Sequence, residues 1–136
     1  MVKAIRFSLA ILTLIITGSS FKQTYDLAGS IKRGKDLYVT NCQNCHSEDG
    51  TGQAGMYPPL AGADFMKSPA KDLITVMLKG QSGEVTVNGV KYNDDMQAYD
   101  YLTDDQVADV LNFAKNTWGN KSTVIILPEQ VKQARQ

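Results

Sequence analysis

The most regular pattern of apolar and polar positions lies in the last third of the chain. Apolar residues recur there at i, i+3, i+4, i+7 and i+11, the spacing of one helical face: Val107, Val110, Leu111, Ala114 and Trp118. The segment from Thr103 to Gln106 has the sequence of a capping box, which satisfies backbone groups in the first turn of a helix. The pattern predicts an amphipathic helix that begins near residue 104 and ends at Gly119 or Asn120.

A second helix is predicted over residues 31–41, with Ser30 as its N-cap. Its apolar positions, which include Leu37 and Tyr38, lie on one side, and its charged residues lie elsewhere. Gly34 within this segment costs about 1 kcal/mol relative to alanine in a helix. Such a glycine indicates either the close approach of another helix or an ordinary surface position.

A third helix is predicted between Pro69 and Lys79. Ser68 is a favourable N-cap, Pro69 a favourable first helical residue and Gly80 a favourable terminator. The segment is strongly apolar, which is typical of a core helix, and its large apolar residues are Leu73, Ile74, Val76, Met77 and Leu78.

One further segment has the pattern of strands. Residues 84–92 alternate around Asn88-Gly89, and Asn-Gly between alternating residues is the strongest short-range signal for a β-hairpin. The hairpin is short, so it predicts an insertion in a helical protein and no separate β domain. The tail, residues 121–136, has room for one more short helix after Pro128. Together the elements predict an all-α protein of four to five helices.

The composition narrows the class of protein. The chain has 136 residues, of which 43% are apolar, and this length and composition suit a single packed domain. Lysine plus arginine and aspartate plus glutamate both number 14, so the formal net charge is zero. A nucleic-acid partner is not expected, because nucleic-acid binding favours a basic surface.

Residues 1–20 have the pattern of an export signal. A positive segment that contains Lys3 and Arg6 precedes an apolar run from Phe7 to Thr17, and small residues follow it. The run is shorter than the roughly 20 residues that a membrane span needs. We therefore expect a cleaved signal peptide and a periplasmic protein, with an uncleaved N-terminal anchor in the cytoplasmic membrane as the alternative. Residues 21–29 are expected to form a mobile lead.

The candidate chemistry lies in the segment Cys42-Gln43-Asn44-Cys45-His46. Two cysteines at this spacing, followed directly by histidine, are the attachment signature of a c-type haem. Each thiol can add to one haem vinyl group, and two intervening residues let one turn of chain present both sulfurs to one edge of the porphyrin. His46 is then placed to ligate the iron. Haem attachment agrees with export, because in bacteria it takes place on the outer face of the cytoplasmic membrane.

Three other interpretations of this segment are weaker. A thioredoxin-like redox pair would need a βαβ context, whereas the preceding pattern is helical. A structural zinc site needs four ligands, and the whole chain contains two cysteines and one histidine. A disulfide across two residues would be strained and would leave His46 without a role.

The second axial ligand of the iron is expected to be a methionine. Ligation by two histidines is impossible, because His46 is the single histidine of the chain. Met96 is favoured, since it lies on an irregular segment between the hairpin and the last helix, which can place a thioether on the far face of the haem. Met56 and Met66 are the alternatives, and Met77 is expected in the core.

The loop after the motif contains Pro58 and Pro59, which remove two backbone donors and stiffen the chain. Such a loop suits one face of the haem. A proline carbonyl there can accept a hydrogen bond from the second ring nitrogen of His46, which is how a ligating histidine is usually oriented.

The order of these features resembles that of the small bacterial mono-haem cytochromes c of class I, over about residues 30–120. The resemblance implies the cytochrome c fold, in which N- and C-terminal helices cross beside one covalently bound haem c and its iron. It also implies that Pro58 accepts the hydrogen bond from His46 and that Leu60 contacts the ring. The sequence departs from the family at Gln97, where a proline often follows the axial methionine.

The site and the resemblance predict a one-electron carrier and not an enzyme. An iron with His46 and Met96 on its two faces has no open position for a substrate. A small haem peroxidase would need an open position and a distal acid or base, and a haem sensor would need an output domain. Expected partners are a redox donor and a redox acceptor protein. The alternative is a cytochrome subunit of a larger dehydrogenase, nitrite reductase or oxidase complex.

Overall fold

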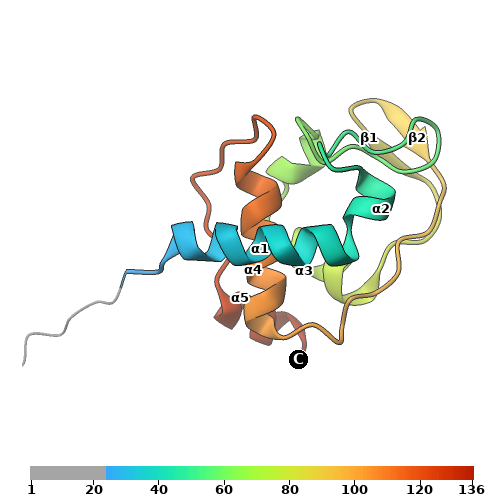
Figure 1. The fold of residues 1–136 in the computed structure, drawn as a ribbon. Coiled ribbons are helices and arrows are strands. Elements are labelled where there is room, and N and C mark those ends of the chain that lie inside the picture. The colour runs from blue at the N-terminus through green and yellow to red at the C-terminus, as the bar shows by residue number, and fades with distance from the viewer. Residues whose placement is uncertain (1–23) are drawn as a thin grey trace, which may run out of the picture.

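The computed structural model describes residues 24–136 (Figure 1). The predicted export signal, residues 1–20, lies outside the described residues. These form five α-helices, one 3₁₀ helix and one β-hairpin, in the order α1 (Leu27–Asn41), α2 (Gln43–His46), η1 (Asp64–Lys67), α3 (Ala70–Lys79), β1 (Val85–Val87), β2 (Val90–Tyr92), α4 (Asp104–Asn116) and α5 (Pro128–Ala134). The predicted all-α class with a small hairpin is confirmed. Between residues 24 and 136, no helix combines the length and the apolar character needed to cross a membrane.

The first long helix begins earlier than predicted. The Asp26 side chain caps α1 by accepting a hydrogen bond from a backbone amide in the first turn, so the helix begins at Leu27. Residues 27–29, which were expected in a mobile lead, are therefore helical. The expected cap at Ser30 is wrong, because this side chain is completely buried and its hydroxyl accepts a hydrogen bond from Asn112 of α4. A sequence pattern does not reveal such a distant partner.

The N- and C-terminal helices cross at Gly34, where α1 passes over α4 (Figure 1). A Cβ atom on Gly34 would lie 2.0 Å from the carbonyl oxygen of Asp109, so the two helices approach this closely because the residue is glycine. Of the two interpretations that the sequence left open for Gly34, the structure shows the close approach of another helix. Next to the crossing, Arg33 Nε lies 2.7 Å from a carboxylate oxygen of Asp109, whose side chain is 4% exposed.

The helix α4 has the predicted capping box but ends sooner than predicted. Its last residue is Asn116, three or four residues before the expected end. Trp118 lies outside the helix, with φ of 52°. Its ring packs against Tyr38 of α1 and Phe113 of α4, at centroid distances of 4.8 and 5.2 Å. The apolar position at i+11 thus reflects tertiary packing of an indole, and not a further turn of helix.

The middle helix and the hairpin follow the prediction closely. The helix α3 ends at Lys79, and Gly80 terminates it with φ of 74°. It begins one residue later than expected, so Pro69 occupies the N-cap position. In the hairpin, Asn88 and Gly89 have φ of 51° and 78°, the left-handed conformation that a two-residue type I′ turn requires.

The tail packs on the helical core. The short helix predicted after Pro128 is present as α5, and its Val131 is completely buried, as is Ile126 before it. The amide of Asn112 in α4 donates to the carbonyl oxygen of Ile126 at 2.9 Å and accepts from its backbone nitrogen at 2.8 Å. The buried side chain of Asn112 therefore satisfies both backbone groups of Ile126, as a neighbouring strand would, and fixes the tail to α4.

Candidate haem site

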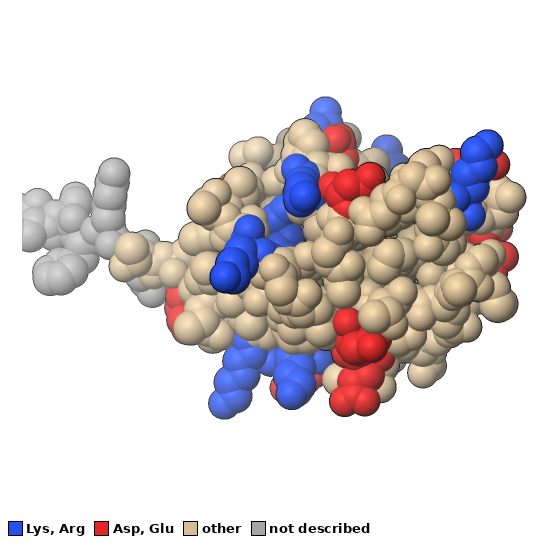
Figure 2. Space-filling model, turned by 90° about the horizontal axis from the view of Figure 1, so that it is seen from above, with Lys and Arg blue, Asp and Glu red and all other residues tan. Residues whose placement is uncertain are grey.

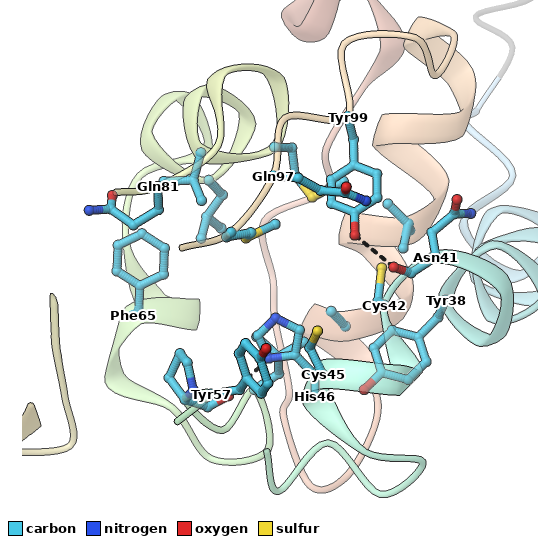
Figure 3. A pocket seen from close by; sticks show the side chains of 18 of the residues that line it. Tyr38, Asn41, Cys42, Cys45, His46, Tyr57, Phe65, Gln81, Gln97 and Tyr99 are labelled. Atoms are coloured by element: carbon cyan, nitrogen blue, oxygen red, sulfur yellow. Dashed lines mark hydrogen bonds between the residues drawn. The ribbon is translucent and has the colours of Figure 1, made fainter. Parts of the chain in front are cut away.

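An apolar cavity of about 370 Å³ lies beside α2, within the size range of cofactor sites. All the residues that the sequence predicted for haem binding line this one cavity: Cys42, Cys45, His46, Pro58, Leu60 and Met96. In Figure 3, Cys45 and His46 lie across the cavity from Gln81, and Cys42 lies close to Tyr99. Residues separated by some fifty positions in the sequence are therefore brought to one place by the fold.

One turn of helix presents the motif to the cavity. The helix α1 ends at Asn41, and the amide of Cys42 still bonds to the carbonyl of Tyr38 at 2.8 Å. The amides of Cys45 and His46 then both bond to the carbonyl of Cys42, which closes the short helix α2. The two thiols and the imidazole consequently project from a single rigid turn.

The imidazole of His46 is held in an orientation suited to a metal ligand. Its Nδ1 lies 2.9 Å from the carbonyl oxygen of Pro58, to which a ring N–H donates (Figure 3). This hydrogen bond leaves Nε2 with its lone pair free for the iron. Burial lowers the pKa of His46, and the hydrogen bond to Pro58 opposes that shift. The neutral ring that metal ligation needs is therefore the favoured form.

The cysteines do not have the properties of a reactive redox pair. No disulfide joins them in this structure. Burial, and secondly the neighbouring Cys45, raises the pKa of Cys42 to about 12, whereas redox-active cysteines have a lowered pKa. Among residues 24–136, no group of three or more histidine, cysteine or acidic side chains is placed to hold a metal ion. The raised pKa of Cys42 argues against the thioredoxin-like interpretation, and the donor set of two cysteines and an oriented imidazole fits a covalent haem with a proximal histidine.

The four candidate methionines differ in position. Met56 is 48% exposed and, unlike the other three, does not line the cavity. Met66 and Met77 line the cavity from helices and are otherwise buried. Met96 lies on an irregular segment, where it exchanges two backbone hydrogen bonds, of 2.9 and 2.8 Å, with Gln81. These two backbone hydrogen bonds fix the position of the segment that carries Met96.

Some cavity residues carried no signal in the sequence. Tyr99 lines the cavity, and its hydroxyl donates to the carbonyl oxygen of Asn41 at 2.7 Å, which ties the segment after Met96 to the end of α1 (Figure 3). Part of the apolar face of α4, expected simply as core, forms one cavity wall through Val110 and Leu111. The helical periodicity predicted the apolar face of α4 but did not reveal that part of this face lines a cavity.

Two thiols and a buried imidazole on one turn, at the edge of an apolar cavity beside crossing helices, define a protein of the c-type haem class. The chain belongs to the cytochrome c family, whose family model matches residues 31–118. It is therefore an electron-transfer protein with covalently bound haem c, as predicted. When bound, this group supplies an iron centre that gains and loses one electron.

Curated relatives fall into two kinds. Cytochrome c-552 of Thermus thermophilus is 36% identical over 110 residues, which cover 75% of this chain and 83% of the relative. The cytochrome c subunit of alcohol dehydrogenase (quinone) of Gluconacetobacter polyoxogenes is 35% identical over 112 residues, 75% of this chain and 22% of that subunit. The gluconate 2-dehydrogenase cytochrome c subunit of Pantoea cypripedii is 31% identical over 127 residues, 85% of this chain and 28% of that subunit.

Proposed function

We propose that the protein is a one-electron carrier whose haem is attached through Cys42 and Cys45 and ligated by His46 and Met96. The observation that carries this proposal is that all four side chains line the same cavity. The carbonyl oxygen of Pro58 orients the imidazole of His46, and Leu60 supplies an apolar contact to the haem ring. With both axial positions filled by the protein, the iron can change its oxidation state with little structural rearrangement.

The choice of Met96 over Met66 and Met77 rests on its backbone. A ligand on an irregular segment can approach the iron from the face opposite His46, and the paired hydrogen bonds to Gln81 limit its movement. Met66 and Met77 belong to the helices η1 and α3, where their side chains contribute to the core. A filled sixth position disfavours peroxidase chemistry, and the chain has no second histidine to act as a distal base.

An optical spectrum of the ferric protein, matured in an exporting host, tests the ligand pair. We expect a methionine-to-iron charge-transfer band in the wild type that is lost in Met96→Ala and kept in Met66→Ala and Met77→Ala. The two latter variants are controls for loss of a methionine from the same cavity. Loss of the band in Met66→Ala or Met77→Ala alone would reassign the ligand, and a high-spin wild-type spectrum would contradict the carrier proposal.

The protein acts, in our proposal, in the periplasm or at the outer face of the cytoplasmic membrane, between a redox donor and a redox acceptor protein. The pattern of residues 1–20 supports export. The dehydrogenase cytochrome subunits among its relatives support the second possibility, that the chain is a subunit of a larger redox complex. Size-exclusion chromatography of native extracts, followed at the haem Soret absorbance, distinguishes a free carrier from a complex.

A further inference from the structure

A second cavity, of about 480 Å³, lies where η1 meets the loop that follows α4. Its lining is mixed, partly apolar through Ala63, Met66 and Val124. The polar part consists of three lysines, three hydroxyl-bearing residues and an asparagine: Lys67, Lys115, Lys121, Ser68, Ser122, Thr123 and Asn120. Among the described residues, no aspartate or glutamate lines it. Met66 lines both this cavity and the haem cavity, so the two are neighbours that share this residue.

The most informative residue of this cavity is Lys115. It is 4% exposed, although it carries an ammonium group. Its Nζ has one hydrogen-bond partner among the described residues, the carbonyl oxygen of Met66 at 2.7 Å. An ammonium has three N–H donors, and a buried charge is costly unless it is paired. Burial accordingly lowers the pKa of Lys115. A buried ammonium beside a cavity that no carboxylate lines can act as a favourable partner for an anion that enters.

The two other lysines add to this charge. Lys67 and Lys121 are exposed, and within residues 24–136 neither forms an ion pair. The cavity therefore gathers three positive charges that the described residues leave uncompensated. The charges of Lys67 and Lys121 are solvated and cost little by themselves, but together with Lys115 they make the potential in the cavity positive, which favours the entry of an anion.

The walls of the cavity are already held in place. The side chain of Asn120 donates to the carbonyl oxygens of Leu60 and Ala114 at 2.9 and 2.8 Å and accepts from the amide of Gly62 at 2.9 Å. These three bonds join the loop before η1 to the end of α4. Because these bonds hold the cavity walls in place before an anion binds, binding would not carry the entropic cost of ordering them.

We propose that this cavity is a binding site for a small oxyanion of the phosphate class, held by Lys115 at its base and by Lys67 and Lys121 at its rim. The hydroxyls of Ser68 and Thr123 can donate further hydrogen bonds to the anion. This inference goes beyond electron transfer and does not depend on which methionine ligates the iron.

Amide NMR spectra of the haem-loaded, reduced protein test the site with inorganic phosphate as the probe. Sodium phosphate replaces sodium chloride at constant ionic strength, so general screening does not change. We expect saturable shifts of the amides of residues 119–124. The double variant Lys67→Gln/Lys121→Gln should weaken binding by about tenfold, because two charge-assisted hydrogen bonds are lost.

The control is Lys32→Gln/Lys35→Gln, which removes the same charge from exposed positions on α1. It should leave the phosphate affinity within about twofold of the wild type. Shifts that do not saturate, or equal losses in the two double variants, would overturn the proposal. A second experiment measures binding of the protein to phosphatidylglycerol vesicles. If the protein binds these vesicles through Lys67 and Lys121 but shows no saturable binding of free phosphate, the site binds a lipid headgroup, and the proposal of a free anion is contradicted.

Discussion

Gly34 has no room for a side chain, because the backbone of α4 passes directly above it. Replacement by alanine must separate α1 from α4, and overpacking of this kind costs about 1–3 kcal/mol. We expect Gly34→Ala to lower the free energy of unfolding by an amount at the upper end of that range, measured by denaturant titration of the haem-loaded protein. Lys35→Ala, at an exposed position of the same helix, is the control and should change stability little.

The ion pair between Arg33 and Asp109 leads to a second prediction for single residues. Arg33 is largely exposed, but its partner carboxylate is buried, so Arg33→Met leaves a charge in the interior without compensation. We expect this variant to be clearly less stable than Lys32→Met, which removes an exposed neighbouring charge. Adding Asp109→Asn to Arg33→Met should recover part of the loss. No recovery in the double variant would mean that the arginine stem, and not the unpaired carboxylate, accounts for the effect.

At the scale of elements, the end of α3 controls the position of Met96. A Cβ atom on Gly80 would lie 2.4 Å from the carbonyl oxygen of Met96, and Gly80 has φ of 74°. We expect Gly80→Ala to displace the segment that carries Met96. The methionine-to-iron charge-transfer band should weaken and the midpoint potential should fall, because methionine ligation raises the potential.

Gly83→Ala is a matched control for this change. Gly83 has φ of 79°, so alanine suffers the same backbone strain there, but a Cβ atom meets nothing within 4 Å. The control should lose some stability while keeping the band and the potential. Equal spectral changes in the two variants would show that backbone strain alone, without the contact to Met96, is responsible.

The attachment of the tail gives another prediction for elements. Asn112 makes both backbone hydrogen bonds of Ile126, so Asn112→Ala leaves a buried amide and a buried carbonyl without partners. Groups of this kind cost about 1–3 kcal/mol each. For the two groups together we expect a loss of unfolding free energy of about 2–6 kcal/mol and faster hydrogen exchange of the α5 amides. Gln133→Ala, on the exposed side of α5, should change neither quantity. Unchanged exchange would mean that apolar packing alone holds the tail.

At the scale of the whole molecule, charge influences the encounter with redox partners. The formal net charge is zero, and Figure 2 shows positive and negative side chains scattered over an otherwise uncharged face. Local charges near the haem cavity should therefore dominate, and Asp94 and Asp95 are exposed residues that line it. At low ionic strength, Asp94→Asn/Asp95→Asn should slow oxidation by tris(phenanthroline)cobalt(III) and speed oxidation by ferricyanide, each by roughly two- to fivefold. Stopped-flow measurements, with Asp36→Asn/Glu129→Gln as the charge-matched control, test this expectation.

The sequence predicted those features that depend on a few neighbouring residues. The capping box before α4, the Asn-Gly hairpin and the spacing of Cys42, Cys45 and His46 are of this kind. The errors occurred where distant contacts override local preference. Ser30 bonds across to α4 and is not a cap, and Trp118 packs on α1 and is not part of a helix. Helix propensity does not encode either contact.

In the candidate site, too, the residues that belong to a local motif could be predicted from the sequence, and those placed by tertiary contacts could not. The attachment motif is local, so its residues could be named from the sequence. The hydrogen bond from His46 to Pro58 and the cavity position of Leu60 were implied by the resemblance, and the geometry of the fold agrees with both. Tyr99 and the paired bonds between Gln81 and Met96 are products of tertiary structure, and no sequence pattern marks them.

The straight helix α1 has a consequence for how the protein can be tethered. Its 15 residues span about 22 Å at the usual rise per residue, and the attachment motif follows directly at its far end. The start of the helix thus lies on the opposite side of the molecule from α2 (Figure 1). We therefore expect that a tether joined to the start of α1 would leave the attachment motif on the side of the molecule that faces away from the membrane.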